Sequence, residues 1–281
     1  MKILRASIGS SPCYCVCREG FLTPLSGLGS LAQLIAEHSD PSNELEQLLD
    51  SAEPHPLEQA ELLMPFDQDA KIICVGRNYA EHASEMGGKP GDIPVIFSKF
   101  GAALTGHRQP VRLPSISEQV DYEAELVVVI GKAARNVSPA QAKESIFGYT
   151  CGNDISARDW QKGKPGGQWL LGKTFETFAP VGPWIVTADE IGFSPSLNIE
   201  LRLNGKTMQS SNTSKLIFGI DYLISHLSQF FTLNPGDLIF TGTPEGVGAA
   251  RDPQVFLKPG DQLEVEIEKI GVLQNPVIEA C

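Results

Sequence analysis

The segment DYEAELVVVI, residues 121–130, places two glutamates directly before an unbroken run of aliphatic residues. A run of this kind, ended here by Gly131, is typical of a buried β-strand. Because side chains alternate along a strand, Glu123 and Glu125 would point to the same face. Two carboxylates beside a hydrophobic core need a compensating charge, which a hard divalent cation would supply. The alternative is a solvent-facing strand end, and this segment alone leaves both interpretations open.

A third carboxylate candidate lies downstream, in the polar segment GNDISARDWQ at residues 152–161. Together with Glu123 and Glu125, Asp154 would complete a Mg²⁺ or Mn²⁺ site with positions left open for water or substrate. Taken by itself, Asp154 is also a good helix N-cap.

Two other features are candidates for binding an anion. Arg158 and Gln161 lie three residues apart, so a helical turn would place them on one side. An arginine there suits a substrate carboxylate, and the alternative is an ion pair with Asp159 or another nearby acid. In residues 241–248, three glycines leave backbone N–H groups open to an anion, although a purely structural turn has the same composition. No lysine–serine pair follows these glycines, so they are not a nucleotide-binding P-loop.

His82 and Glu85 are candidates for acid–base chemistry. They lie three residues apart within residues 79–86, a stretch that suits a short helix. On a helix they share a face, so the carboxylate could orient the imidazole, and the pair could remove a proton from water or from a substrate carbon. The alternative is a solvated helix face. Lys173 lies between apolar neighbours, which is unusual for a surface lysine, and could stabilise negative charge on a substrate oxygen.

The composition excludes several classes of protein. The 281 residues carry 22 basic and 34 acidic side chains, a formal net charge of −12, so nucleic acid is an unsuitable partner. No apolar run reaches the ~18 residues of a membrane span, and the first 20 residues lack the apolar core of a secretory signal. We therefore expect a cytoplasmic protein whose six cysteines are thiols. The spacing of Cys13, Cys15 and Cys17 is not that of a zinc site.

The pattern along the chain predicts two domains. Residues 1–65 read as a small N-terminal α+β domain ending in a proline-bearing linker, and residues 71–281 as the catalytic domain. Apolar residues every three or four positions predict one long helix over residues 216–230. Strands are expected over residues 1–8, 13–17, 71–75, 95–97, 111–113, 123–130, 185–186, 197–203, 206–209, 238–241, 255–257 and 263–267. Many short strands with few helices predict an α+β, mostly β chain.

Five motifs, in this order, resemble the fumarylacetoacetate hydrolase superfamily over about residues 71–278. They are VGRNY at 75–79, DYEAE at 121–125, GNDISARD at 152–159, GKTF at 172–175 and TGTPEGVG at 241–248. The similarity is strongest to the long members that carry a small N-terminal region. The resemblance implies a mixed β-roll catalytic core, a homodimer, and one Mg²⁺ or Mn²⁺ per subunit.

The resemblance also implies roles for individual residues. The implied metal ligands are Glu123, Glu125 and Asp154. The implied catalytic residues are the acid–base pair His82 and Glu85, with Lys173 beside the metal. The residues implied to lie near a substrate carboxylate are Arg158, Gln161 and Thr243. The superfamily acts on small-molecule 2-oxo acids through a metal-bound enolate.

Within the superfamily, residues 94–100, 168–175 and 210–213 look most like a branch linked to oxaloacetate keto–enol tautomerisation, which is therefore the predicted activity. The alternatives are C–C bond hydrolysis of acylpyruvate or fumarylacetoacetate-type substrates, and decarboxylation of oxaloacetate. A further alternative is an isomerase or hydratase of aromatic catabolism, of the 5-carboxymethyl-2-hydroxymuconate type. The alternative from another class is a non-catalytic protein that binds a metal or a carboxylate.

Overall fold

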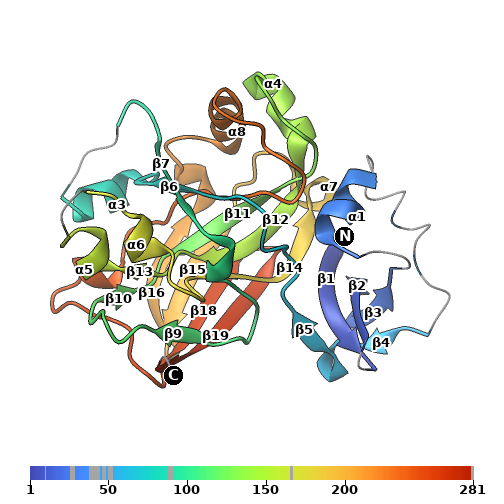
Figure 1. Cartoon of the computed structure of the whole chain (residues 1–281), viewed down its shortest axis with the longest axis horizontal. Coiled ribbons are helices and arrows are strands. Elements are labelled where there is room, and N and C mark those ends of the chain that lie inside the picture. Colours follow the sequence, from blue (N-terminus) through green and yellow to red (C-terminus); the bar gives the residue numbers. More distant parts are fainter. Residues whose placement is uncertain are drawn as a thin grey trace.

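The computed structural model describes residues 1–9, 11–25, 29–37, 45, 49, 53–87, 91–164 and 167–279. In this part of the chain the strands form a 12-stranded sheet, a five-stranded sheet and a separate pair, with short helices around them (Figure 1). This architecture confirms the expected α+β, mostly β fold.

The elements of the 12-stranded sheet are β1 (Lys2–Ile8), β2 (Ser11–Arg18), β3 (Phe21–Pro24), β4 (His55–Pro56), β5 (Glu61–Leu63), β6 (Ile72–Gly76), β7 (Val95–Lys99), β8 (Leu104–Thr105), β11 (Ala124–Ile130), β12 (Ile146–Asn153), β14 (Ala179–Thr187) and β17 (Leu238–Phe240). The five-stranded sheet contains β9 (Val111–Leu113), β15 (Asn198–Leu203), β16 (Lys206–Asn212), β18 (Gln262–Ile267) and β19 (Gly271–Glu279). The pair is β10 (Val120–Asp121) and β13 (Ser156–Ala157). The α-helices are α1 (Leu31–Glu37), α3 (Ala80–Glu85), α4 (Pro139–Ala142), α5 (Arg158–Gln161), α6 (Leu170–Lys173), α7 (Ala188–Ile191) and α8 (Ile220–Ser228). The 3-10 helices are η1 (Leu57–Gln59), η2 (Gly101–Ala103), η3 (Lys143–Ser145), η4 (Thr213–Lys215) and η5 (Gly248–Ala250).

Strand β11 lies inside the large sheet, whose order is β4-β3-β2-β1-β14-β12-β11-β17-β6-β7. All seven of its residues are buried. Leu126 and Val128 face one hydrophobic core, whereas Val127 and Val129 face another. A strand covered on both faces has no polar side, which explains the unbroken aliphatic run in its sequence.

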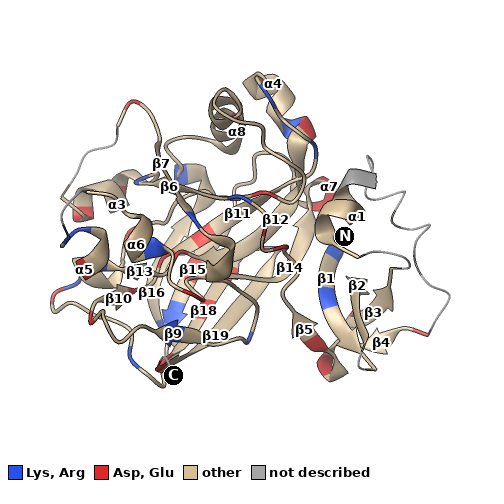
Figure 2. Ribbon diagram, viewed as in Figure 1, with Lys and Arg blue, Asp and Glu red and all other residues tan. Residues whose placement is uncertain are grey.

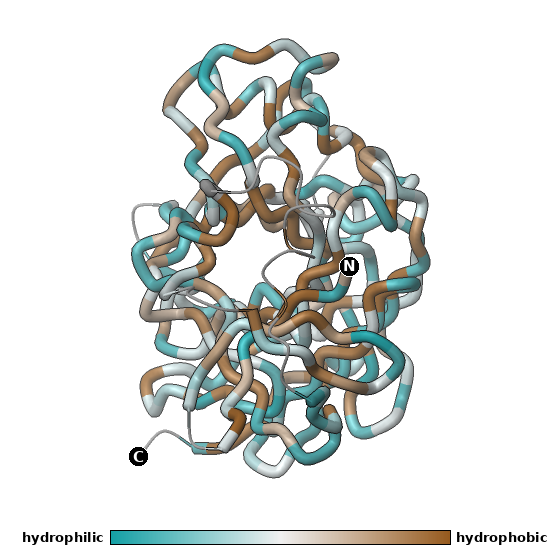
Figure 3. Tube along the Cα trace, turned by 90° about the vertical axis from the view of Figure 1, so that its right-hand side faces the viewer, coloured by the Kyte–Doolittle hydropathy of each residue, from teal (hydrophilic) through white to brown (hydrophobic). Residues whose placement is uncertain are grey.

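The first core lies between the two sheets. It joins Leu126 and Tyr149 of the large sheet to Leu201 and Val265 of the small one. Figure 3 shows many hydrophobic segments around the middle of the view, whereas the outer loops alternate between hydrophobic and hydrophilic segments. Helix α8 also packs against this core and confirms a helix within residues 216–230, but it has only nine residues. Leu216 lies before the helix, at the end of η4, and Phe230 is exposed beyond it.

The N-terminal segment joins the same large sheet. Strand β1 pairs with β14 in antiparallel register, Lys2 opposite Val186 and Ile3 opposite Ile185. The stretch expected as a linker contributes β4 and β5, which pair with β3 and β1. The predicted division between residues 65 and 71 therefore falls between two parts of one sheet, and their independence as domains stays a prediction.

The strand predictions failed in two ways, by one strand too many and by several strands missed. Residues 255–257 are not a strand, because Val255 and Leu257 donate only isolated hydrogen bonds to Gly248 and Val120. Of β14, only residues 185–186 were expected. The described strands that were not anticipated are β3, β4, β5, β8, β10, β12, β13 and β19, although β12 is the direct neighbour of β11.

Charged residues of both signs are interspersed along the ribbon (Figure 2). Within the described residues, no helix has the length and apolar character needed to cross a membrane.

Candidate active site

Three carboxylates from two neighbouring strands meet at one end of the large sheet. Glu123 and Glu125 flank the first residue of β11, and Asp154 directly follows β12. The two strands are paired so that Ala124 lies opposite Asn153. One carboxylate oxygen of each acid lies within 4.8 Å of the others, and all three residues are buried. We call Glu123, Glu125 and Asp154 the carboxylate cluster.

Backbone hydrogen bonds fix the cluster. The Asp154 N–H donates to the Glu123 carbonyl at 2.8 Å, and the Glu123 N–H donates to Asn153 Oδ1 at 2.9 Å. Glu125 accepts a hydrogen bond from the Gly242 N–H at 2.7 Å. The predicted common face of Glu123 and Glu125 thus becomes one wall of a pocket, to which Asp154 also contributes.

Within the carboxylate cluster, the surroundings of Glu125 disfavour its negatively charged form. Burial, together with the charges of Asp154 and Glu123, raises the pKa of Glu125 well above its usual value. Burial also opposes ionisation of Glu123, but the charges of Lys173 and Arg158 prevail and lower its pKa. A buried carboxylate that has no basic partner close enough to keep it ionised suits a cation, and a set of three carboxylates suits Mg²⁺ or Mn²⁺. The residues present therefore fit a divalent metal.

Lys173 lies directly against the cluster. Its Nζ donates to Glu123 Oε2 and to Asp154 Oδ2, each at 2.7 Å. Burial lowers the pKa of this lysine, but the two carboxylates outweigh burial and raise it. Helix α6 can approach α5 this closely because residue 172 is glycine: a Cβ there would lie 2.5 Å from the Gln161 nitrogen. The surface-lysine alternative is therefore wrong.

Lys99, at the end of β7, is a site residue that the sequence analysis missed. Its buried ammonium lies 2.6 Å from Asp154 Oδ1 and donates to the carbonyls of Ile155, Lys173 and Phe178 at 2.9, 2.6 and 2.6 Å. It therefore ties β7 to the segment after β12 and to the end of α6. The only signal in the sequence is a lysine ending an apolar strand, which is commonly a solvated position.

Arg158 and Gln161 lie on one side of α5, as expected, and both line the pocket. The Arg158 guanidinium pairs with Asp121 Oδ2 at 2.8 Å and with Glu123 Oε1 at 2.6 Å, and it donates to Gln161 Oε1 at 3.0 Å. Asp159 instead accepts a hydrogen bond from Ser117. Arg158 is thus held by protein carboxylates, and its predicted contact with substrate stays a prediction.

Thr243 also lines the pocket and accepts a hydrogen bond from Gln209 Nε2 at 2.8 Å. This bond holds the hydroxyl oxygen of Thr243 in position. The predicted place of Thr243 near a substrate carboxylate stays a prediction.

His82 and Glu85 form the expected pair on α3. His82 Nδ1 lies 2.8 Å from Glu85 Oε1, and Glu85 Oε2 accepts a hydrogen bond from the Gly246 N–H at 2.9 Å. In the neutral tautomer that donates from Nδ1 to this carboxylate, Nε2 is left as an acceptor. His82 is buried and lines the pocket, so the alternative of a solvated helix face is wrong for this residue.

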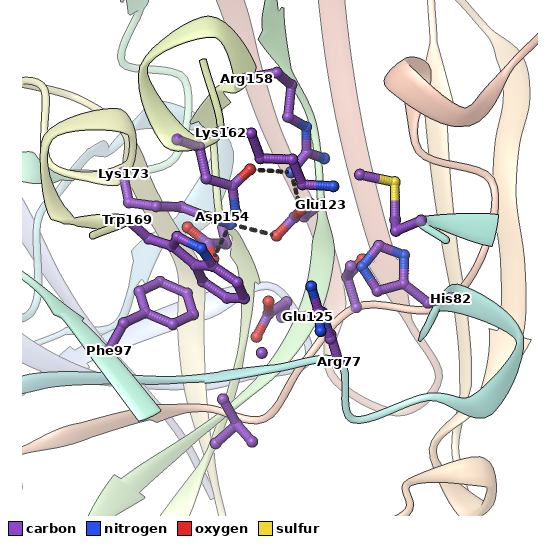
Figure 4. Close-up of a pocket in the computed structure, with 15 residues that line it drawn as sticks. Arg77, His82, Phe97, Glu123, Glu125, Asp154, Arg158, Lys162, Trp169 and Lys173 are labelled. Atoms are coloured by element: carbon purple, nitrogen blue, oxygen red, sulfur yellow. Dashed lines mark hydrogen bonds and ion pairs between the residues drawn. The ribbon is translucent and has the colours of Figure 1, made fainter. Parts of the chain in front are cut away.

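The remaining pocket wall carries aromatic and basic side chains. Trp169 packs edge-on against Phe97 with 5.3 Å between ring centroids, and the Arg77 guanidinium lies 5.8 Å from the Trp169 ring. Lys162 completes this wall, and Figure 4 shows all four around the carboxylate cluster. No role was predicted from the sequence for any of these four side chains. Figure 1 shows that α3, α5 and α6 gather on this side of the molecule, away from the N-terminal strands.

Comparison with known proteins identifies the family to which the chain is similar. The family model described as fumarylacetoacetate (FAA) hydrolase C-terminal matches residues 71–278. Oxaloacetate tautomerase fahd2, mitochondrial, of Xenopus laevis is 48% identical over 217 residues, 77% of this chain and 68% of that protein. Human oxaloacetate tautomerase FAHD2A, mitochondrial, is 45% identical over 223 residues, 79% of this chain and 71% of that protein.

Solved structures agree over the whole chain. The fumarylacetoacetate hydrolase of Exiguobacterium antarcticum superposes with a TM-score of 0.88 at 34% identity, covering 100% of both chains. A 2-hydroxyhepta-2,4-diene-1,7-dioate isomerase of Mycobacterium marinum gives a TM-score of 0.80 at 34% identity, covering 99% of this chain and 98% of that one.

Proposed function

Since the chain belongs to the fumarylacetoacetate hydrolase family and is an enzyme of that family, we propose that it catalyses oxaloacetate keto–enol tautomerisation. The observation that carries the proposal is the convergence of the carboxylate cluster, Lys173 and His82 on one pocket. Relatives that are 48% and 45% identical to it over the matched 217 and 223 residues are named for this activity.

The proposed cofactor is Mg²⁺ or Mn²⁺, held by Glu123, Glu125 and Asp154. When bound, such a cation acts as a Lewis acid that polarises a keto oxygen and acidifies the neighbouring C–H group. The oxygen-only donor set and the raised pKa of Glu125 support this assignment.

The remaining residues of the pocket have separate roles in proton transfer. His82 Nε2 accepts a proton from C3 of the 2-oxo acid and returns it to the enol oxygen, or the reverse, while Glu85 holds the imidazole in this tautomer. Lys173, fixed by Glu123 and Asp154, places a positive charge beside the developing enolate. Trp169 and Phe97 give the pocket an apolar wall beside these groups.

A paired assay tests the proposal. Metal-stripped protein is mixed with oxaloacetate, with and without added Mg²⁺, while ultraviolet absorbance follows the enol and a coupled assay follows pyruvate. Rapid Mg²⁺-dependent loss of enol without pyruvate is the expected result. Release of pyruvate would instead indicate a decarboxylase, and the absence of both changes would contradict oxaloacetate as the substrate.

Hydrolysis of an acylpyruvate is the second candidate, because the Glu85-oriented His82 is also suited to activating water. In that reaction the water attacks the distal carbonyl and the C–C bond breaks. Equimolar formation of acetate and pyruvate from acetylpyruvate would favour this candidate, and unchanged acetylpyruvate would remove it.

A further inference from the structure

We propose that Arg77 and Lys162 form an anion-binding subsite at the rim of the pocket, which selects 2-oxo acids that carry a second carboxylate. The inference rests on the proposed function, because it names the substrate class of the same site. Both side chains line the pocket that contains the carboxylate cluster. Figure 4 shows Arg77 beside Glu125 and Lys162 near Glu123 and Arg158.

Among the described residues, these two cations differ from Lys99, Lys173 and Arg158 in that no carboxylate forms an ion pair with them. Lys99, Lys173 and Arg158 each form ion pairs with buried carboxylates. Arg77 and Lys162 form none within the described part of the chain. The chain has 34 acidic and only 22 basic side chains, so acidic partners are abundant. Two basic side chains that line the pocket without an ion pair are therefore available to an anionic group of a ligand.

The Arg77 side chain is held in place for this role. Its backbone has φ +57°, a left-handed conformation that is uncommon for a residue with a Cβ, directly after β6. Its guanidinium lies over the ring of Trp169, which in turn packs against Phe97. The indole fits closely because residue 76 is glycine: a Cβ there would lie 2.5 Å from the Trp169 ring.

Lys162 directly follows Gln161 at the end of α5 and is exposed at the rim. Partial burial, together with the positive charges of Arg158 and Arg77, lowers the pKa of its ammonium. The rim is thus a region where positive charges repel one another. An anion bound between them relieves this repulsion and is in turn stabilised by both.

The chemistry of the proposed substrate fits such a subsite. Oxaloacetate and pyruvate share the 2-oxo acid group, and they differ in that oxaloacetate has a second carboxylate where pyruvate has a hydrogen. A subsite for that second carboxylate should separate the two ligands, whereas a site that recognises only the 2-oxo acid group should not.

The test compares the binding of these two ligands. Calorimetry in the presence of Mg²⁺, with freshly dissolved oxaloacetate and with pyruvate, gives the ratio of their dissociation constants for the wild type and for Arg77→Met and Lys162→Met. Each substitution should reduce the preference for oxaloacetate about ten-fold and change pyruvate affinity less than about two-fold. The matched control is Lys164→Met, which removes a charge from the same turn. Lys164 lies over Trp160, does not line the pocket, and should leave the ratio unchanged.

The proposal would be overturned if both variants kept the wild-type ratio of dissociation constants, or if they lost affinity equally for oxaloacetate and pyruvate. Lys162→Met decides the question if Arg77→Met does not fold, because Lys162 is exposed. The binding ratio is independent of turnover, so the two proposals fail separately. A wild-type protein that binds oxaloacetate through these residues without tautomerising it would contradict only the proposed function.

Discussion

Replacement of Lys99 by methionine tests how the site is held together. Methionine keeps the length and most of the volume of the side chain but removes the ammonium. The change leaves the Asp154 carboxylate without one of its two basic partners and three buried carbonyls without the donor they share. Removing one partner of a buried ion pair typically lowers the free energy of unfolding by about 3–5 kcal/mol. Because Lys99 is only 3% exposed, solvent screening does not reduce this figure.

The measurement is urea denaturation followed by fluorescence. With a slope of ~3 kcal/mol per molar urea, the midpoint should fall by about 1 M or more. Lys215→Met is the matched control, because Lys215 is 46% exposed and lies 3.5 Å from Glu81. Exposed pairs of this kind contribute less than about 1 kcal/mol, so the control should unfold close to the wild type. A Lys99→Met protein that also unfolds within about 1 kcal/mol of the wild type would refute the structural role assigned to this lysine.

Four further predictions follow from the site and the proposed assembly. Glu125→Gln should weaken Mg²⁺ binding in calorimetry at least about ten-fold, because it removes one charged ligand; unchanged affinity would contradict the cluster as a metal site. Burial and the neighbouring acids raise the pKa of Glu125 above 4.5, so this group binds more protons in the metal-free folded protein than in the unfolded chain. Its contribution to the unfolding free energy should therefore fall as the pH rises above 4.5 toward the raised pKa, and the wild type should lose more stability over this range than Glu125→Gln; equal slopes would argue against a raised pKa. His82→Gln should lower kcat for oxaloacetate about 10²–10⁴-fold with Mg²⁺ affinity retained, and full activity would remove its acid–base role. Light scattering should give a homodimer of twice 30.4 kDa, and a mass of one chain would exclude it.

The parts of the site that follow local periodicity could be predicted from the sequence. Alternation along a strand placed Glu123 and Glu125 on one face, and the three-residue spacing of His82 and Glu85 placed them on one face of a helix. The structure confirms both relations, because each depends only on backbone geometry within a few residues.

The parts that depend on long-range packing could not be predicted. Strand β12 is buried on both faces, so its sequence shows no alternation, and its two glycines interrupt a segment that otherwise has strand-forming residues. Lys99 obtains its partners from residues 154–178, far along the chain, and nothing near it in the sequence indicates that it is buried. Arg77 belongs to a quoted motif, but its position at the pocket rim depends on Trp169, which comes from another segment.

The pairing of β1 with β14 has a consequence for how the protein tolerates truncation. The segment that matches the family model begins at residue 71, so an expression fragment based on it would omit β1 to β5. That fragment would leave β14 with an unpaired edge and uncover Val181 and Ile185, which pack against Ile3 and Tyr14 in one core. Open, apolar strand edges recruit other chains. The fragment should therefore aggregate even though it contains every proposed ligand and catalytic group.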